Sequence, residues 1–454
     1  MASGGAAWGW TFLAVSVVGA LFTLNAYLPI RRPGPVATVS FFAGWLTCEL
    51  AAHHLAWQML ATLVFVWMGA LDSPQGLVAM GLSVLSWASL ARLVQRGHHA
   101  WEVTEAALEE GLAPNATAGE PRSAGRVPVR AIARPFHMHH PDVVVERDVP
   151  FHDVGLTTLC VDVYAPRQRP AGGPLLLFFH GGAWILGFKQ YQALPMMHRL
   201  AAAGWICMSF DYRLSPRATF PDHLIDVKHA IAWAKEHAAD YGGDASFVAV
   251  SGNSAGAHLA SLAALTWDDA TLQPGFEEAD TRVDACVALY GVYDIAGRFD
   301  HWRNGTLAWV LENLVMKTSR AESPDRYRRG SPIDHARADA PPFLVVHGAR
   351  DTVVPTGEAR QFVRALREAG AKPVVYLEVP DAQHAFDVFR SVRGHHTLRA
   401  VSDFLVTVRA RAAASAAERA GSVERATERH ASPAAGSRAK AAGEPAQHTS
   451  GHAS

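Results

Sequence analysis

The first hundred residues contain three long stretches in which charged positions are almost absent. Residues 11–30, 55–71 and 77–94 are apolar, and residues 1–30 carry no charge at all. A stretch of about 20 apolar residues is long enough to cross the hydrocarbon core of a bilayer. Because Arg31 and Arg32 follow the first stretch instead of preceding it, we expect a retained membrane helix and not a signal peptide.

The chain between the first two stretches has a different character. Around residues 41–54 it is predicted to form an amphipathic lead-in, with Glu49 at the membrane interface. Three spans would make this a multi-pass membrane protein. Four arginines then share one side of the membrane with the rest of the chain, and the positive-inside rule makes that side cytoplasmic. They are Arg31, Arg32, Arg92 and Arg96.

Two other divisions of this region stay open. If residues 33–71 form two spans, the topology reverses and the rest of the chain lies on the other side. Alternatively, the apolar stretches form a buried helical layer on a soluble domain. Three almost uncharged stretches in so short a segment favour the membrane.

From about residue 131 the pattern changes to short apolar runs that alternate with helical stretches. Residues 174–180 and 206–212 are almost continuously apolar, as expected of strands buried on both faces of a sheet. Strand and helix repeated in this way predict an α/β fold with a mostly parallel central sheet flanked by helices. The predicted strands are 143–149, 158–164, 174–180, 206–212, 247–252, 285–291, 343–348 and 373–379. The main predicted helices are 223–242, 255–265, 358–370 and 397–414.

These patterns divide the chain into four parts. Residues 1–100 are the membrane region, and the polar, Ala/Gly/Pro-rich residues 101–130 are a linker. Residues 131–414 are the α/β catalytic domain, in which residues 292–342 interrupt the alternation as a cap. Residues 415–454 lack hydrophobic periodicity and are predicted to be a disordered tail.

Composition excludes several classes of function. The formal net charge is −1, which gives no electrostatic reason to bind nucleic acid. The four cysteines lie far apart and form no Cys-x-x-Cys pair, so neither a zinc site nor a disulfide framework is indicated. We expect single buried thiols.

The candidate nucleophile is Ser254. It lies in Gly252-x-Ser254-x-Gly256, between an apolar strand and an Ala/Leu-rich helix. A nucleophile elbow requires this strand–turn–helix setting, because the glycines allow the sharp turn that exposes the serine. Taken alone, the same five residues would also suit a plain glycine-rich turn.

The other parts of a serine hydrolase are found at the ends of three more strands. His180 ends one strand, and Gly181 and Gly182 after it offer backbone N–H groups to an oxyanion, as does Ala255 at the start of the helix. A plain glycine turn is the alternative for this loop.

Asp351 and His384 follow two later strands, at the edge where active sites of parallel sheets form. The chain order Ser254, Asp351, His384 is the α/β-hydrolase order. Asp381 and Asp387 remain as structural or alternative carboxylates.

In sequence order, HGGAW, DYRLSP, GNSAG, HGARDTVVP and QHAF make residues 130–410 resemble the hormone-sensitive-lipase-like esterases, bacterial carboxylesterases and lipases of the α/β-hydrolase superfamily. The resemblance implies that Ser254 is the nucleophile, His384 the general base and acid, and Asp351 its orienting partner. It also implies that Asp211 and Arg213, with His180, support the loops near the oxyanion hole. The chain departs from the family pattern at Ala183, where a third glycine is usual, and at Asn253, where an acid is usual.

The sequence therefore predicts a membrane-anchored ester hydrolase that works through an acyl-enzyme and needs no metal or organic cofactor. Its expected partners are a small-molecule ester, with lipid-derived esters as one class, and the lipid bilayer. Two alternatives stay open, an arylformamidase-like amidase on the same scaffold and a non-catalytic receptor or scaffold with this fold. The oligomeric state and the natural substrate are not determined by the sequence.

Overall fold

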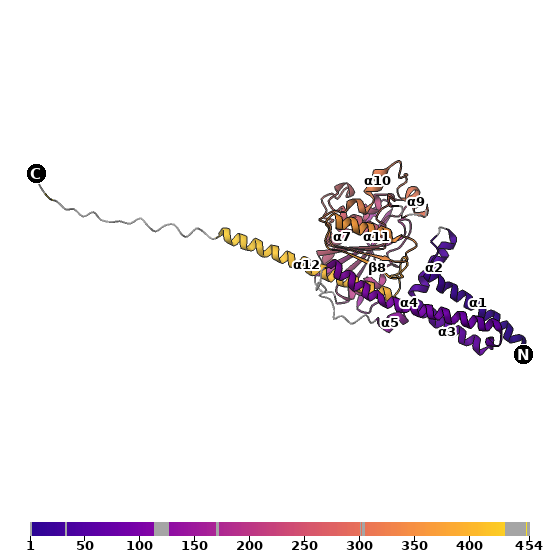
Figure 1. Ribbon diagram of the computed structural model, residues 1–454. Coiled ribbons are helices and arrows are strands. Elements are labelled where there is room, and N and C mark those ends of the chain that lie inside the picture. The colour runs from indigo at the N-terminus through magenta and orange to yellow at the C-terminus, as the bar shows by residue number, and fades with distance from the viewer. Residues whose placement is uncertain are drawn as a thin grey trace. The chain divides into compact units, whose positions relative to one another are not determined.

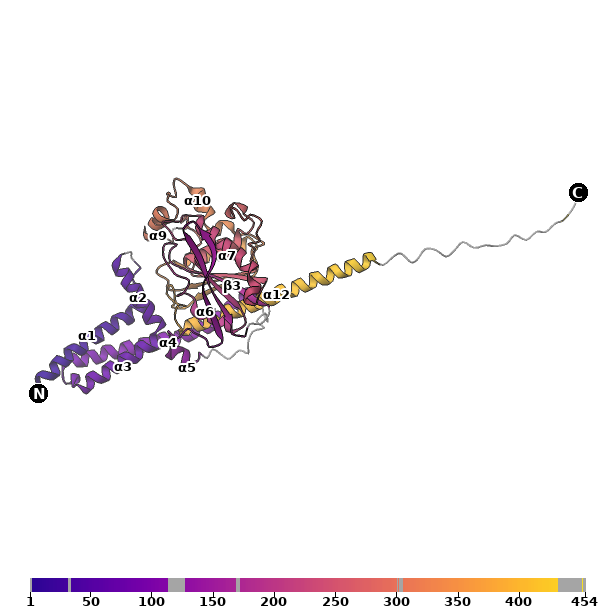
Figure 2. The ribbon, with the colours of Figure 1, turned by 180° about the vertical axis from the view of Figure 1, so that it is seen from behind.

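The structure is a computed structural model that describes residues 2–31, 34–112, 127–168, 172–299, 301, 305–431 and 451. It contains two compact units, Met1–Arg409 and Ala410–Ser454. Figure 1 and Figure 2 show the ribbon from two sides. Arg32 lies outside the described residues.

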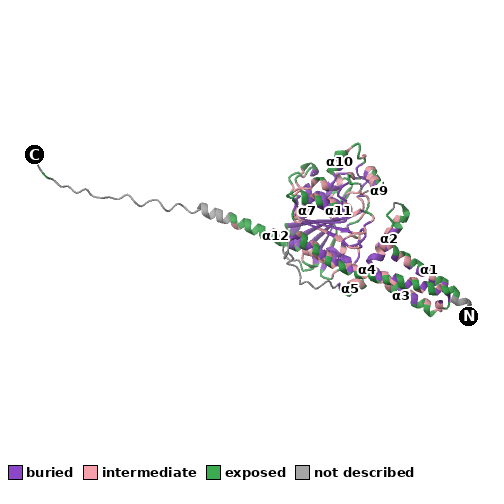
Figure 3. Cartoon of the chain, viewed as in Figure 1, coloured by how far each residue is buried: buried purple, intermediate pink, exposed green. Residues whose placement is uncertain are grey.

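The N-terminal region is a bundle of helices with mixed buried contacts and an apolar outer surface. The buried contacts include small apolar clusters, such as Phe12 with Ala70 and Ala79. They also include hydroxyl pairs such as Ser16 with Ser83, 3.0 Å apart, and Thr23 with Ser86, 2.8 Å apart. Large apolar side chains such as Leu63 are exposed instead. This arrangement suits a lipid environment, where small and hydroxyl-bearing residues join helices and apolar ones face the tails. The helices are α1 (Ala2–Tyr27), α2 (Pro35–Glu49), α3 (Ala51–Trp67) and α4 (Pro74–Leu112), with a 3₁₀ turn η1 (Ala70–Asp72). Figure 3 shows exposed positions along α1 and α3.

Two of these helices meet the length and composition that a membrane span needs. Among the described residues they are Ala6–Tyr27 and Pro74–Leu112, and α2 with α3 would add a third if that bent pair counts as one span. The predicted lead-in, residues 41–54, is divided between the end of α2 and the start of α3, and these two helices meet at 90°. Glu49, expected at the interface, is the last residue of α2 and is buried at this bend.

The catalytic part is built on one eight-stranded sheet in the order β1-β2-β4-β3-β5-β6-β7-β8. All eight predicted strands are present. β1 and β2 pair antiparallel, as do β2 and β4, and the remaining pairs are parallel. The strands are β1 (Val143–Val154), β2 (Thr157–Pro166), β3 (Gly173–Phe179), β4 (Ile206–Phe210), β5 (Gly243–Asn253), β6 (Ala285–Leu289), β7 (Phe343–Gly348) and β8 (Val374–Val379). Because β3 to β8 are parallel, the loops that leave them gather at one edge of the sheet.

Helices cover the sheet, and β3, β4, β6 and β7 are completely buried between them. α7 and α8 pack on each other, and α8 lies against β5 and β6. The helices are α5 (Val129–Ala133), α6 (Leu194–Ala202), α7 (Asp222–Glu236), α8 (Ala255–Leu265), α11 (Thr356–Glu368) and α12 (Val392–Ala431), with short turns η2 (Ala238–Tyr241) and η3 (Ala270–Leu272).

The inserted segment lies between the end of β6 and the start of β7, as predicted. It contains α9 (Gly305–Val310), a π-helical turn η4 (Leu311–Val315), α10 (Pro324–Arg329) and η5 (Pro332–His335). His258 of α8 joins it to the core, because its Nε2 is 2.7 Å from the carbonyl oxygen of Gly330.

Two predicted boundaries are corrected. α4 continues beyond residue 100 to Leu112 and packs on the edge strand β8, so the first part of the predicted linker is helix. α12 continues to Ala431, whereas residues after 414 were expected to be disordered. That extension is rich in Ala, Glu and Arg, which favour helix intrinsically without any apolar face for packing. Residues 432–450 lie outside the described part of the chain.

Candidate active site

Ser254 stands on a strained turn between β5 and α8. Its backbone has φ 52° and ψ −119°, a conformation that is unfavourable for a residue with a side chain. The turn is possible because glycines flank it closely: a Cβ on Gly252 would collide with the backbone of Gly256, and one on Gly256 with the carbonyl oxygen of Phe179. The predicted elbow is therefore present in its full geometry.

Asp351 and His384, predicted from the ends of β7 and β8, are in direct contact. His384 Nδ1 lies 2.7 Å from Asp351 Oδ2. The other carboxylate oxygen accepts the N–H groups of Val353 and Val354, each at 2.8 Å. The aspartate is thus fixed by its own loop. Its contact with Nδ1, at the edge of the imidazole, fixes the orientation of the ring.

The Asp351 carboxylate is held ionised in a buried place. Burial by itself would raise its pKa, but the charge of His384 and hydrogen bonds from His347 and His384 lower the pKa well below the ordinary aspartate value. His347 Nε2 is 3.3 Å from Asp351 Oδ2. Sequence reasoning did not single out His347, although it lies four residues before Asp351 in the quoted motif HGARDTVVP.

Tyr290 connects the nucleophile loop to the histidine loop. Its ring packs edge-on against the imidazole of His384, with centroids 4.6 Å apart. Its hydroxyl accepts a hydrogen bond from Asn253 Nδ2 at 3.1 Å and donates one to the carboxylate of Asp387. The residue before it, Leu289, accepts the N–H of Ser254 at 2.9 Å. Tyr290 was missed because nothing local to its strand end indicates these distant partners.

The two alternative carboxylates have other partners. Asp387 bonds Tyr290, and burial raises its pKa. Asp381 forms ion pairs with Arg96 and Arg350 at 2.6 and 2.8 Å. Asp351 is therefore the carboxylate that contacts His384.

The predicted oxyanion loop lies against the nucleophile. A Cβ on Gly181 would be 3.0 Å from Ser254 Cβ. The N–H of Gly181, however, already donates to Gln192 Oε1 at 2.7 Å, and Gln192 Nε2 donates back to the Gly181 carbonyl at 3.2 Å. Gly181 can serve an oxyanion only after Gln192 withdraws. Ala255, as the first residue of α8, has an N–H with no intrahelical acceptor.

The residues predicted to support this loop make the following contacts. His180 is buried, its ring stacks on Tyr212 with centroids 4.4 Å apart, and burial lowers its pKa to about 4. Asp211 pairs at 3.1 Å with Lys189, which follows the glycine loop. Arg213 is bound by Asp226 of α7 at 2.7 Å.

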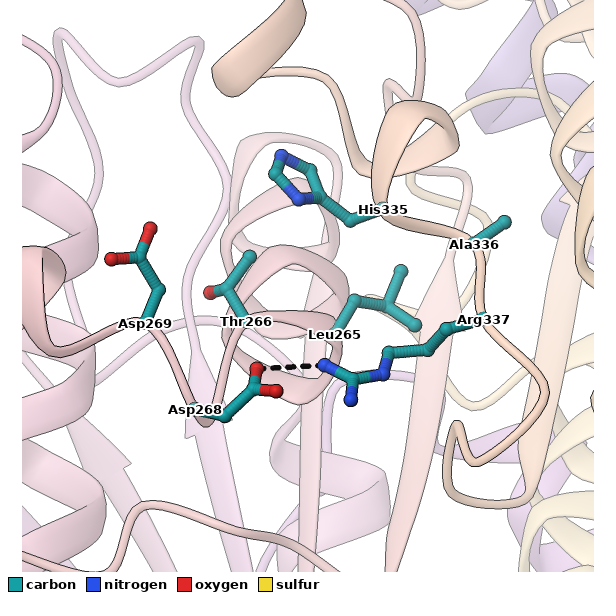
Figure 4. A pocket seen from close by; sticks show the side chains of 7 residues that line it. All are labelled: Leu265, Thr266, Asp268, Asp269, His335, Ala336 and Arg337. Carbon is teal, nitrogen blue, oxygen red and sulfur yellow. Dashed lines mark hydrogen bonds and ion pairs between the residues drawn. The ribbon is translucent and has the colours of Figure 1, made fainter.

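A separate pocket lies away from these residues. It is about 260 Å³ in volume, and the Asp268–Arg337 ion pair of 2.7 Å forms part of its wall (Figure 4). Leu265 and Thr266, which also line it, are at the C-terminal end of α8, whereas Ser254 precedes its N-terminal end. This pocket therefore has no direct contact with the candidate nucleophile.

Comparison with known proteins decides the family. A family model described as BD-FAE matches residues 161–366, which include Ser254 and Asp351. The chain is 41% identical to the probable carboxylic ester hydrolase LipM of Mycobacterium tuberculosis (strain ATCC 25618 / H37Rv) over 404 residues, which cover 87% of this chain and 93% of LipM. The chain belongs to the hormone-sensitive-lipase-like esterases of the α/β-hydrolase superfamily. This esterase is a carboxylic ester hydrolase.

Two further relatives agree. Esterase LipQ of the same mycobacterium is 37% identical over 395 residues, covering 84% of this chain and 87% of LipQ. The structure of Thermogutta terrifontis esterase 2 phosphonylated by sarin superposes with a TM-score of 0.51 at 25% identity, covering 59% of this chain and 95% of that one. The 87% of this esterase that aligns with LipM is a larger share than residues 131–454, so the similarity reaches into the N-terminal helices.

Proposed function

We propose that this esterase is anchored in a membrane and cleaves carboxylic esters through Ser254, His384 and Asp351 by way of an acyl-enzyme. The observation that carries the proposal is the 2.7 Å contact between His384 Nδ1 and Asp351 Oδ2, at the sheet edge where the elbow holds Ser254. A histidine bound to a carboxylate through Nδ1 keeps Nε2 unprotonated and available as a base.

The reaction follows from this arrangement. Nε2 of His384 takes the proton of Ser254 Oγ as that oxygen attacks the ester carbonyl carbon. The tetrahedral intermediate collapses, the C–O bond to the alcohol breaks, and the imidazolium returns the proton to the leaving alcohol. Water, deprotonated by His384, then attacks the acyl carbon. The bond from that carbon to Ser254 Oγ breaks, the carboxylic acid leaves, and the imidazolium returns the proton to Ser254 Oγ. Asp351 remains ionised throughout and stabilises the imidazolium.

The oxyanion is proposed to rest on backbone N–H groups. Ala255, at the positive end of the α8 dipole, and Gly182 are the two donors that need no rearrangement of Gln192. Gly181 becomes a third donor when the carboxamide of Gln192 moves away.

The membrane part of the proposal rests on the N-terminal bundle. Its exposed faces are apolar, and α1 and α4 are long enough to span a bilayer. An esterase held at a lipid surface meets esters that partition into it, so lipid-derived esters are the proposed substrate class. We also propose that the catalytic part faces the cytoplasm, on the side of Arg92 and Arg96.

The nucleophile is tested with Ser254→Ala in the full-length protein. Turnover of a short-chain aryl ester and labelling by a fluorophosphonate should both disappear while the thermal unfolding temperature stays within a few degrees. The matched control is Ser246→Ala, which changes an exposed serine at the far end of the same strand and should label normally. Labelling of the Ser254→Ala protein would refute the assignment.

Substrate class is tested with a series of esters of increasing acyl length, presented in solution and in phospholipid vesicles. Rising kcat/KM with acyl length in vesicles supports lipid-derived esters, and a preference for short soluble esters contradicts them. Amides with the same acyl groups, measured in parallel, test the arylformamidase-like alternative.

A further inference from the structure

The loop that carries His384 is held by an ion cluster reaching into the N-terminal helices. Asp381, three residues before His384, has a side chain only 2% exposed. Its carboxylate is 2.6 Å from Arg96 of α4 and 2.8 Å from Arg350, the neighbour of Asp351. A third cation, Arg393 at the start of α12, lies 3.8 Å away. One buried carboxylate thus joins both triad loops to α4.

The same arginines bind backbone carbonyls of the N-terminal helices. Arg350 donates to the carbonyl of Ala26 in α1 at 2.6 Å. Arg393 donates to the carbonyls of Cys48 and Leu93, at 3.1 and 3.2 Å, and also to Pro380 at 2.8 Å. Because Arg393 is itself almost fully buried, its own hydrogen bonds are screened little by water.

Helix α2 also contacts the loop that carries His384. The indole N–H of Trp45 donates to the carbonyl of Ala385 at 2.9 Å, and Cys48 Sγ donates to the carbonyl of Asp381 at 3.2 Å. The Trp45 ring also stacks on Phe389, with centroids 4.7 Å apart. In Figure 1, α2 leaves the bundle of α1, α3 and α4 and runs alongside the α/β part.

The two carbonyls that α2 binds belong to strained residues. Asp381 has φ 58° and Ala385 has φ 59°, both in the left-handed region that residues with a Cβ adopt at a cost. They bracket His384 closely on both sides. Such a conformation persists only where surrounding contacts fix it, and the hydrogen bonds from Trp45 and Cys48 are among those contacts.

We propose that the N-terminal helices are part of the catalytic scaffold, and that Asp381, Trp45 and Cys48 are positioning residues for His384. The inference rests on the proposed role of His384 as the base. These residues do not touch substrate. They hold the imidazole where its Nε2 can reach Ser254, and a misplacement of about 1 Å at such a site lowers the rate by up to about 100-fold. The membrane region thus does more than anchor the enzyme.

The sharpest test uses substitutions that remove one donor and leave the packing in place. Trp45→Phe keeps an aromatic ring beside Phe389 but loses the N–H to Ala385. The full-length protein in nanodiscs should show kcat on a soluble aryl ester about three- to tenfold lower, with KM within twofold, since one hydrogen bond is lost. Its control is Trp57→Phe, which removes an indole N–H that bonds His54 within α3, and this variant should behave as wild type.

A second pair tests the Cys48 contact by rescue. Cys48→Ala removes the donor to Asp381 and should lower kcat, whereas Cys48→Ser restores a donor and should recover most of it. Asp381→Asn, which unbalances three arginines, should reduce kcat by about tenfold or more. The rate of fluorophosphonate labelling at Ser254 should fall in parallel with kcat in each case.

The outcomes separate this inference from the proposed function. Suppose that the wild-type protein labels at Ser254 but that the Trp45→Phe and Cys48→Ala variants both keep the wild-type kcat. The positioning role is then overturned, while the triad stands. If these variants raise KM and leave kcat unchanged, the positioning role is overturned as well. If wild type does not label at all, the proposed function itself fails.

Discussion

Asn253, the residue before Ser254, donates a hydrogen bond from Nδ2 to the hydroxyl of Tyr290, 3.1 Å away. The Tyr290 hydroxyl in turn donates a hydrogen bond to the carboxylate of Asp387, so the three side chains form one chain of donors and acceptors. An aspartate at position 253 would place a second carboxylate on a hydroxyl that has one proton to give. Because Asp387 already accepts the hydrogen bond from Tyr290, position 253 must supply a donor to the tyrosine oxygen. The carboxamide of Asn253 does so, whereas the acid usual in the family would not.

Removing the Tyr290 hydroxyl should destabilise the protein. In Tyr290→Phe the Asn253 amide and the Asp387 carboxylate lose their shared partner while buried, which costs about 1–3 kcal/mol. Chemical denaturation measures the change. Tyr164→Phe is the matched control, because the buried Tyr164 hydroxyl has no hydrogen-bond partner among the described residues and its loss should cost little. Equal losses in the two variants would contradict the network.

Asp351→Asn should reduce kcat by about 10³- to 10⁴-fold with little change in KM, because the carboxamide cannot hold His384 in the required tautomer or stabilise the imidazolium. Its effect on stability should depend on pH. The pKa of Asp351 is lower in the folded protein than its unfolded value of about 3.9, so its contribution is present above about pH 4 and lost as pH falls below it.

The measurement is the unfolding free energy of wild type and Asp351→Asn from about pH 7 down to about pH 3. The advantage of wild type should shrink at the acidic end. An advantage that grows there would mean that the aspartate is protonated in the native state.

Glu358 should have the opposite pH dependence. It is buried in α11, where one carboxylate oxygen accepts the N–H groups of Tyr293 and Asp294 at 3.0 and 2.9 Å. Burial, and then the charge of Asp294, raise the pKa of Glu358 to about 7. A raised pKa favours the folded state at low pH and loses that contribution as pH rises from about 4.3 towards 7.

Glu358→Gln should therefore gain stability relative to wild type across that window, by up to about 1 kcal/mol per pH unit. Thermal unfolding at a series of pH values checks this, with the exposed Glu368→Gln at the end of the same helix as the control. A constant difference between Glu358→Gln and wild type would show that the carboxyl does not titrate in this range.

Gln192 should limit the rate if Gly181 is an oxyanion donor. Its carboxamide oxygen occupies the Gly181 N–H and must leave before the intermediate can use it. Gln192→Leu removes that competitor, so kcat/KM for a small ester should rise about three- to tenfold, the worth of one hydrogen bond. Gln190→Leu, two residues away, is the control. A fall in Gln192→Leu would instead mean that Gln192 shapes the loop through its second bond to Gly181.

Much of the fold was predictable because it is encoded locally. The eight strands are short apolar runs, and burial on both faces of a parallel sheet leaves them no other pattern. The elbow is also local, since Gly252 and Gly256 lie within two residues of Ser254. Even the contact of Asp351 with His384 follows from their places after neighbouring parallel strands, which brings them to one edge.

Two predicted boundaries failed for different reasons. α4 extends to Leu112 because its last turns pack on β8, where Leu108 and Leu112 are buried. α12 extends to Ala431 through a segment with no apolar periodicity, where intrinsic helix propensity decides. Backbone hydrogen bonds within a helix need no partner from elsewhere, so Ala-, Glu- and Arg-rich chain can remain helical without packing.

The sequence by itself thus determined the catalytic fold, the identity of the triad candidates and the apolar helices of the first hundred residues. Only the tertiary structure decided what surrounds them: Tyr290 between Asn253 and Asp387, Gln192 on Gly181, and Trp45 against the loop of His384. The reason is the separation along the sequence of the residues that make each contact. Strands, elbows and helices are fixed by neighbours a few residues apart, whereas Trp45 and Ala385 meet only after the whole chain has folded, and no local pattern carries that contact.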